Sequence, residues 1–291
     1  MLSYFCPTDE GCLIASGGRH MNNLKQHKRI LLLIVILTML LIAFLQAVAF
    51  FWLTEAIAKE MIRDTSIRMI LGTALIIMLY YLGFDPFKKS SKPLLWVAFI
   101  ILPGLFIAIN NFPWSAFLSG RTMLNEPHHL VYLYAIECLS IGFLEETVFR
   151  GIILAIFIQR LPHTKAGAFQ AILVASALFG IIHLVNLAVG ASLPDTLLQV
   201  GYSFLMGALW SVVYLATKSL LYPMLLHATY NFFGLVLYRL GSVTDRFDLI
   251  TILVTAFMAL IVSLFYFGVF GRLTQKEISD TVSADSSHDT F

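Results

Sequence analysis

Two adjacent glutamates and an arginine lie within one of the most apolar parts of this 291-residue sequence. Glu145, Glu146 and Arg150 occur in FLEETVFRG, at residues 143–151. Ionisable side chains in a membrane-spanning segment are costly unless they are paired or hydrated, so they commonly mark functional sites. Glu146 and Arg150 are four residues apart and are predicted to pair on one helical face, whereas Glu145 points about 100° away. Glu145 is therefore left without a partner on its own helix.

Two further apolar segments contain histidine. His227 and Asn231, in HATYN, are four residues apart and project from one face of a helix. His183, in FGIIH, belongs to a different segment. A lone histidine in a membrane segment is more often a packing residue, but the joint occurrence of these groups at similar depth predicts one shared cavity.

A carboxylate, two imidazoles and an amide suit the hydrolysis of a peptide bond. Glu145 would take a proton from water, the resulting hydroxide-like oxygen would attack the carbonyl, and the acid would return the proton to the leaving nitrogen. His183 would orient the water or share its proton. His227 and Asn231 would donate hydrogen bonds to the developing oxyanion, each well-aimed donor contributing a few kcal/mol.

The elements that position these residues are predicted to be membrane helices. Hydrophobic residues make up 59% of the chain and charged residues only 12%, about half the share of a soluble protein. In lipid the backbone must pair within helices, so an all-α, polytopic membrane protein with about eight transmembrane helices around a membrane-embedded polar cavity is expected. The predicted apolar segments are 30–53, 67–84, 94–110, 130–158, 168–190, 196–217, 219–238 and 248–270.

Charge distribution and the two ends of the chain predict its organisation. Residues 1–20 are interpreted as a leader or non-native extension, with Met21 as the natural start, and 21–273 as a single transmembrane domain. Residues 274–291 are polar and predict a disordered cytoplasmic tail. Basic residues flank mainly one side of the predicted spans, which places both termini in the cytoplasm.

Composition also excludes several classes of function. Three cysteines, one of them in an apolar segment, indicate neither a disulfide framework nor a cysteine zinc site. The formal net charge is only +2, and the basic residues sit in short flanks, so no nucleic acid is expected as a partner. The predicted partners are the lipid bilayer and a membrane-associated peptide or protein substrate.

The three motifs EETVFRG, FGIIH and HATYN, in this order, resemble the EExxxR, FxxxH and HxxxN/D motifs of the CPBP family. This family is named for CAAX proteases and bacteriocin-processing enzymes and includes Ras-converting CAAX endopeptidases. The resemblance covers about 130–235 and implies an intramembrane protease, here in the plasma membrane of a bacterium. It implies Glu145 as the water-activating residue, His183 as its catalytic partner, His227 and Asn231 as transition-state stabilisers, and Glu146 and Arg150 as supporting residues.

Metal dependence stays open at this point. Glu145, His183 and His227 would satisfy a zinc ion with an open position for water. However, HExxH is absent, and the amide oxygen of Asn231 is a poor zinc ligand. The sequence therefore favours a glutamate mechanism without a cofactor, with a zinc-dependent protease as the alternative.

Functions other than proteolysis are also compatible with the polar cluster. A membrane adaptor or immunity-type protein would bind a peptide there without cutting it, and a transporter would use the glutamates as proton carriers, although no inverted repeat is evident. Glu137, two turns before Glu145, is either a further cavity residue or a side chain that snorkels towards the membrane surface.

Overall fold

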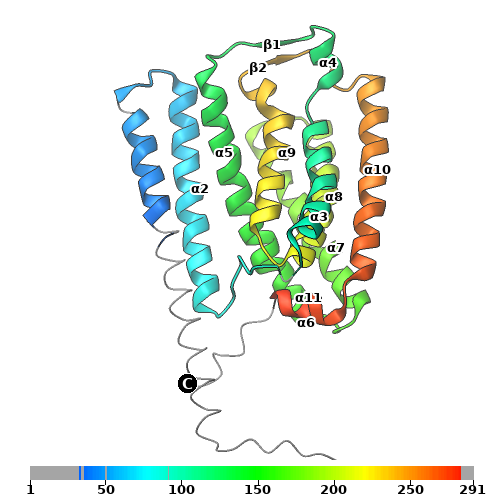
Figure 1. Cartoon of the computed structure of the whole chain (residues 1–291). Coiled ribbons are helices and arrows are strands. Elements are labelled where there is room, and N and C mark those ends of the chain that lie inside the picture. The colour runs from blue at the N-terminus through cyan, green and yellow to red at the C-terminus, as the bar shows by residue number, and fades with distance from the viewer. Residues whose placement is uncertain (1–32, 34–35, 50, 91, 283–291) are drawn as a thin grey trace, which may run out of the picture.

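Proline, glycine and short polar stretches divide the chain into apolar segments, which form one bundle of helices in the computed structural model (Figure 1). The structure describes residues 33, 36–49, 51–90 and 92–282. The predicted leader, the predicted start at Met21 and residues 283–291 of the predicted tail lie outside the described residues. The described elements are an apolar helix at Ile36–Ala49, α2 (Ala56–Tyr81), α3 (Leu94–Asn110), α4 (Trp114–Leu118), β1 (Thr122–Leu124), α5 (His129–Glu146), η1 (Thr147–Leu154), α6 (Ala155–Arg160), α7 (Lys165–Ile181), η2 (Ile182–Val189), α8 (Leu193–Thr217), α9 (Leu221–Arg239), β2 (Gly241–Val243), α10 (Leu249–Arg272) and α11 (Gln275–Val282).

The all-α prediction is confirmed, and the protein is an integral membrane protein. Three helical segments within the described residues are long and apolar enough to cross a bilayer. They are Lys165–Val189, Leu193–Thr217 and Leu249–Arg272, while Ile36–Ala49 and α3 are apolar but shorter. The predicted number of eight spans is not confirmed by the described residues.

Two boundaries differ from those predicted. Helix α2 begins at Ala56 rather than near residue 67. Two of its charged residues pair with other helices, Glu60 with Arg239 of α9 and Arg68 with Glu137 of α5. The prediction of disorder from residue 274 is wrong for Gln275–Val282, which forms α11. Ile278 and Val282 of this helix are buried in the hydrophobic core, which holds the helix against the bundle.

A small two-stranded sheet at one end of the bundle was not predicted. Strands β1 and β2 pair antiparallel, with Thr122 opposite Val243, and lie beside α4 (Figure 1). Each strand has three residues, which is too short to produce a recognisable alternation of apolar and polar side chains.

The segment predicted at 130–158 forms a continuous helical stretch from His129 to Arg160. Its middle part, η1, is a π-helix with i→i+5 backbone bonding, and it begins directly after Glu145 and Glu146. π-helical turns are rare and occur frequently at functional sites. The two glutamates therefore lie at a change of helical winding, near the middle of the longest helical stretch around the site.

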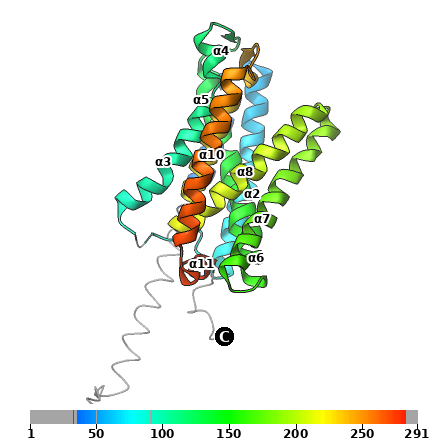
Figure 2. The same ribbon diagram turned by 90° about the vertical axis from the view of Figure 1, so that its right-hand side faces the viewer.

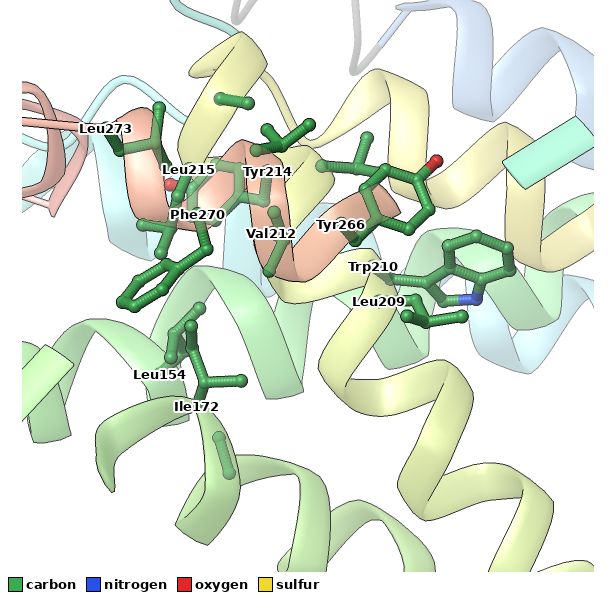
Figure 3. Packing of buried hydrophobic residues seen from close by; sticks show 14 of the residues in the cluster. Leu154, Ile172, Leu209, Trp210, Val212, Tyr214, Leu215, Tyr266, Phe270 and Leu273 are labelled. Atoms are coloured by element: carbon green, nitrogen blue, oxygen red, sulfur yellow. The ribbon is translucent and has the colours of Figure 1, made fainter. Parts of the chain in front are cut away.

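The hydrophobic core fixes the helices behind the polar residues. Trp210 and Tyr214 of α8 pack in one cluster with Tyr266 and Phe270 of α10 and with Leu154 of η1 (Figure 3). Tyr266 also donates a hydrogen bond from its hydroxyl to the carbonyl of Ile100 in α3, at 2.8 Å. The second view shows α7 and α8 side by side and inclined away from the remaining helices at one end (Figure 2).

Helices α5 and α9, which carry most of the candidate site, approach each other closely at Gly142. A Cβ atom at this position would lie 2.5 Å from the backbone oxygen of Met224 in α9. Real Cβ atoms do not come this close to a backbone atom, so only glycine permits this separation of the two helices. The close approach holds the α5 glutamates within reach of His227.

Candidate active site

A single cavity of about 230 Å³ brings together the four residues predicted to be catalytic. Glu145 reaches it from α5, His183 from η2, and His227 and Asn231 from α9. Helix α8 closes another side with Tyr202, Ser203, Met206 and Trp210. Residues distant in the sequence therefore line one space, as their spacing and similar depth predicted.

Glu145 is the accessible carboxylate of this cavity. Its side chain is 33% exposed, and its Oε2 lies 3.6 Å from Nε2 of His227. This distance is slightly longer than a hydrogen bond, and it leaves Glu145 free to contact a water molecule or substrate in the cavity. Of the two histidines, His227 is thus the one that contacts Glu145.

Glu146 lies beside Glu145 but has the opposite environment. It is fully buried, and its Oε1 accepts hydrogen bonds from Arg150 Nη1 at 2.8 Å and from His227 Nδ1 at 2.7 Å. The predicted pairing of Glu146 with Arg150 is confirmed. The sequence did not reveal the second partner: Glu146 also orients the imidazole that contacts Glu145, so the two carboxylates act on the same ring from opposite nitrogens.

Arg150 connects the α5 glutamates with two neighbouring helices. Its side chain is 1% exposed, Nη2 donates to the carbonyl of Gly207 in α8 at 3.1 Å, and the guanidinium lies 4.7 Å from the ring centre of Phe179 in α7. A planar guanidinium suits this combination of hydrogen bonds and aromatic stacking better than the ammonium group of lysine. Arg150 consequently ties the α5 glutamates to both α7 and α8.

Phe179 is a site residue that the sequence reasoning did not single out. Its ring packs edge-on against both imidazoles, with centroid distances of 5.3 Å to His183 and 5.7 Å to His227. Its carbonyl accepts a hydrogen bond from His183 Nδ1 at 2.8 Å. The phenylalanine four residues before the histidine in FGIIH was the available signal, because i and i+4 lie on one helical face.

These contacts define the proton positions on the two rings. A carbonyl oxygen only accepts, so Nδ1 of His183 carries a hydrogen, and its Nε2 remains for a ligand. His227 likewise points Nδ1 at a carboxylate that is already paired with arginine, so Nδ1 donates and Nε2 faces Glu145. A neutral His227 accepts a hydrogen bond at Nε2, and a protonated one donates there.

The cavity also contains polar groups that were not predicted. Asn186 of η2 donates from Nδ2 to Oε1 of Gln199 in α8 at 2.7 Å, and both side chains line the cavity. Tyr202 and Tyr230 line it as well, with ring centres 6.0 Å apart. Tyr230 lies within HATYN but not at one of its defining positions, and the other three residues belong to no motif, so none of the four was predicted.

Glu137 is neither of the two things proposed for it. It does not line the cavity, and its side chain is enclosed by the protein rather than extended outwards. It is buried, and its Oε1 pairs with Arg68 Nη1 of α2 at 3.2 Å. Its partner, Arg68, lies near the start of the segment predicted at 67–84.

The arrangement does not fit a preformed zinc site. No three His, Cys, Asp or Glu side chains within the described residues are grouped so that they could hold one metal ion. Glu145 and His227 are in contact, and the bond from His183 to Phe179 leaves Nε2 of His183 open, but the three side chains are not grouped closely enough to share one ion. The alternative ligand set of Glu145, His183 and His227 would therefore need rearrangement before it could bind zinc.

Comparison with known families agrees with the motifs. Residues 127–233 match the family model described as type II CAAX prenyl endopeptidase Rce1-like. No curated protein and no solved structure is significantly similar to the chain. The matched residues extend from the start of α5 to the middle of α9 and so contain every predicted site residue. Over this part of the chain, the resemblance to the CPBP family of CAAX proteases is confirmed.

Proposed function

We propose that the protein is an intramembrane endopeptidase that uses Glu145 to activate water against a peptide bond. The observation that supports this proposal most directly is the shared cavity, in which a partly exposed glutamate contacts a histidine that a second, buried glutamate orients. A reactive acid or base, an oriented imidazole and an amide in one pocket are the groups expected of a hydrolase site.

The reaction begins with a water molecule beside Glu145. The carboxylate takes one proton from the water as its oxygen forms a bond to the carbonyl carbon of the substrate, and the carbonyl becomes an oxyanion. When the tetrahedral intermediate collapses, Glu145 returns the proton to the leaving nitrogen. The products are a new carboxyl end and a new amino end.

The oxyanion is stabilised by the α9 pair. Asn231 offers an amide donor, and His227 donates through Nε2 when this nitrogen is protonated. Because Glu146 accepts the Nδ1 hydrogen, it fixes the orientation of the ring, a role comparable to that of the aspartate in a serine protease triad. His183, through its free Nε2, positions the water.

The location of the site selects the substrate. Glu145 lies roughly 20–25 Å along the helical stretch from either of its ends, at His129 and Arg160. A chain must enter the bilayer to reach it, so the substrate is a membrane-associated peptide or protein tail. We place the protein in a bacterial plasma membrane with both termini in the cytoplasm, since the basic residues flank that side.

The decisive experiment measures cleavage and binding with the same peptides. Purified wild type and Glu145→Gln are incubated with a membrane-anchored peptide library, with prenylated and unprenylated CAAX peptides included. We expect Glu145→Gln to lose at least about 100-fold in kcat, as for loss of a general base, while retaining peptide binding. Cleavage that survives this substitution in folded protein would contradict the mechanism.

The same assay separates the alternatives. A peptide-binding adaptor predicts no cleavage by the wild type and equal binding by both proteins. A zinc protease predicts stoichiometric zinc in the active wild type and loss of cleavage after exhaustive chelation, with recovery when zinc is added back. The glutamate mechanism predicts that chelation leaves kcat unchanged.

A further inference from the structure

A second cavity lies between α3 and α10, where α11 begins, and shares no lining residue with the candidate active site. Its volume is about 590 Å³, within the roughly 300–1,000 Å³ of small-molecule pockets. The deep end is closed where the two helices touch. Here Phe99 and Phe265 pack edge-on at 5.2 Å, and Tyr266 bonds to the carbonyl of Ile100.

The walls of this cavity change from charged to apolar in the same direction on both helices. Lys92 precedes α3, with Trp96 one turn and Phe99 two turns further in. Helix α10 runs the opposite way and ends in Arg272, with Phe265 two turns further in. Both polar ends therefore meet at one end of the bundle, about 10–12 Å of helix rise from the apolar end.

The charged end is not neutralised within the protein. Lys92 pairs with Glu277 of α11 at 2.8 Å, which balances one positive charge. Arg272 donates Nη1 to the carbonyl of Gly268 at 3.1 Å, and among the described residues no carboxylate pairs with it. One uncompensated guanidinium, with most of its donors unused, thus stands at the mouth of an apolar cavity.

We propose that this cavity binds one anionic phospholipid from the leaflet at this end of the bundle. The phosphate would contact Arg272, and the part of the acyl chains nearest the headgroup would lie along Trp96 and Phe265. The length of the apolar wall agrees with the depth of the headgroup and acyl boundary, and tryptophan is favoured at this level of a membrane. The proposal does not depend on the protease activity.

Native mass spectrometry of the purified protein in detergent tests the proposal. Phosphatidylglycerol and phosphatidylcholine with identical acyl chains are titrated, and the Kd of the first bound lipid is measured. We expect preference for phosphatidylglycerol, and an about fivefold weaker Kd for Arg272→Gln, the effect of one basic residue near an anionic membrane surface. Lys276→Gln is the matched control, since Lys276 is exposed on α11 and does not line the cavity.

A pair of glycine substitutions tests the site without changing charge. A Cβ at Gly268 would meet only the flexible end of Arg272, at 3.3 Å, so leucine there fills the cavity and leaves α10 intact. Gly271 has open space around it and does not line the cavity. We expect Gly268→Leu to weaken phosphatidylglycerol binding at least fivefold and Gly271→Leu to leave it unchanged, within twofold.

Three outcomes would overturn the proposal. They are equal binding of the two phospholipids, equal effects of Arg272→Gln and Lys276→Gln, and wild-type binding by Gly268→Leu. A final measurement adds soluble glycerol phosphate, which has no acyl chains, to the protein with bound phosphatidylglycerol. Displacement of the lipid at equal concentration would identify the occupant as a free anion and not a phospholipid.

Discussion

Helix α5 carries two buried glutamates that have similar local chemistry and different surroundings. Glu137 pairs with Arg68 of α2, and Glu146 pairs with Arg150. In each carboxylate, Oε1 pairs with the arginine, and Oε2 has no hydrogen-bond partner among the described residues. The two glutamates are nine positions apart, which corresponds to about 180° around an α-helix, so they face opposite sides of α5.

The two glutamates differ in the residues that surround their ion pairs. Glu137 lies among the apolar residues between α2 and α5, which include Leu133, Tyr134 and Cys138. Glu146 instead holds His227, and this ring reaches Glu145 and the cavity. A buried charge in a membrane helix therefore does not by itself mark a site. The mark is a buried charge that positions a second titratable group facing a cavity.

Replacing each of these glutamates by glutamine should give the largest contrast. Glu146→Gln leaves Arg150 as an uncompensated buried cation and releases His227, so we expect a loss of about 3–5 kcal/mol in the free energy of unfolding. We also expect kcat to fall at least about 100-fold. Glu137→Gln should cost about 1 kcal/mol and leave kcat unchanged, since Arg68 is 27% exposed and has Asp64 at 3.9 Å.

The double variant Glu146→Gln/Arg150→Met separates stability from catalysis. It removes the unpaired cation, so thermal unfolding in detergent should recover part of the lost stability. Activity should not recover, because His227 still lacks its carboxylate. If activity returned with stability, or if Glu137→Gln reduced kcat as much as Glu146→Gln, the distinction between the two faces of α5 would be wrong.

The active-site face was the part most accessible from sequence. The i,i+4 spacing of Glu146 with Arg150, and of His227 with Asn231, survives in any helix and fixed which side chains share a face. Such polar side chains are rare in apolar segments, so the segments that contain them were expected to meet. The helix limits of α3, α8 and α9 were also close to prediction, since proline or a polar turn borders each.

The remaining features depend on contacts between segments. The bond from His227 to Glu146 spans 81 positions, and no local pattern encodes it. The same holds for the ion pair between Arg68 of α2 and Glu137 of α5, which are 69 positions apart. The π-helix at Thr147–Leu154 and the docking of α11 through Ile278 arise from tertiary packing, which overrides local propensity.

Two glycines test how tightly each face of α5 is packed. An added Cβ would meet a neighbour at 2.5 Å at both Gly142 and Gly72, but the neighbour is the Met224 backbone oxygen in one case and the Phe143 ring in the other. The backbone oxygen of a helix cannot move away from the new Cβ as readily as a side-chain ring can. We expect Gly142→Ala to lower the free energy of unfolding by about 1–3 kcal/mol and to reduce kcat by displacing His227, which follows Met224 on α9.

Gly72→Ala should cost less stability and leave kcat unchanged, because the Phe143 ring can move. The control is Gly201→Ala, where no heavy atom lies within 4 Å of the new Cβ. This substitution should be neutral or raise the free energy of unfolding by about 0.5–1 kcal/mol. Equal losses in Gly142→Ala and Gly72→Ala, measured by thermal unfolding, would show that the α9 face is not the more constrained one.

The smallest effect is expected outside the membrane, at the pair of Lys92 and Glu277. The hydrogen bond from Lys92 lowers the pKa of Glu277 from 4.5 to about 2. A carboxyl whose pKa is lower in the folded state stabilises it above pH 4.5, and this stabilisation is lost as the pH falls towards 2. The protection of the α11 amides from hydrogen exchange, corrected for the intrinsic exchange rate at each pH, should therefore decrease over this range in the wild type. Glu277→Gln should remove that pH dependence. The control, Asp280→Asn on the same helix, should retain it. An unchanged pH profile in Glu277→Gln would show that another group anchors α11.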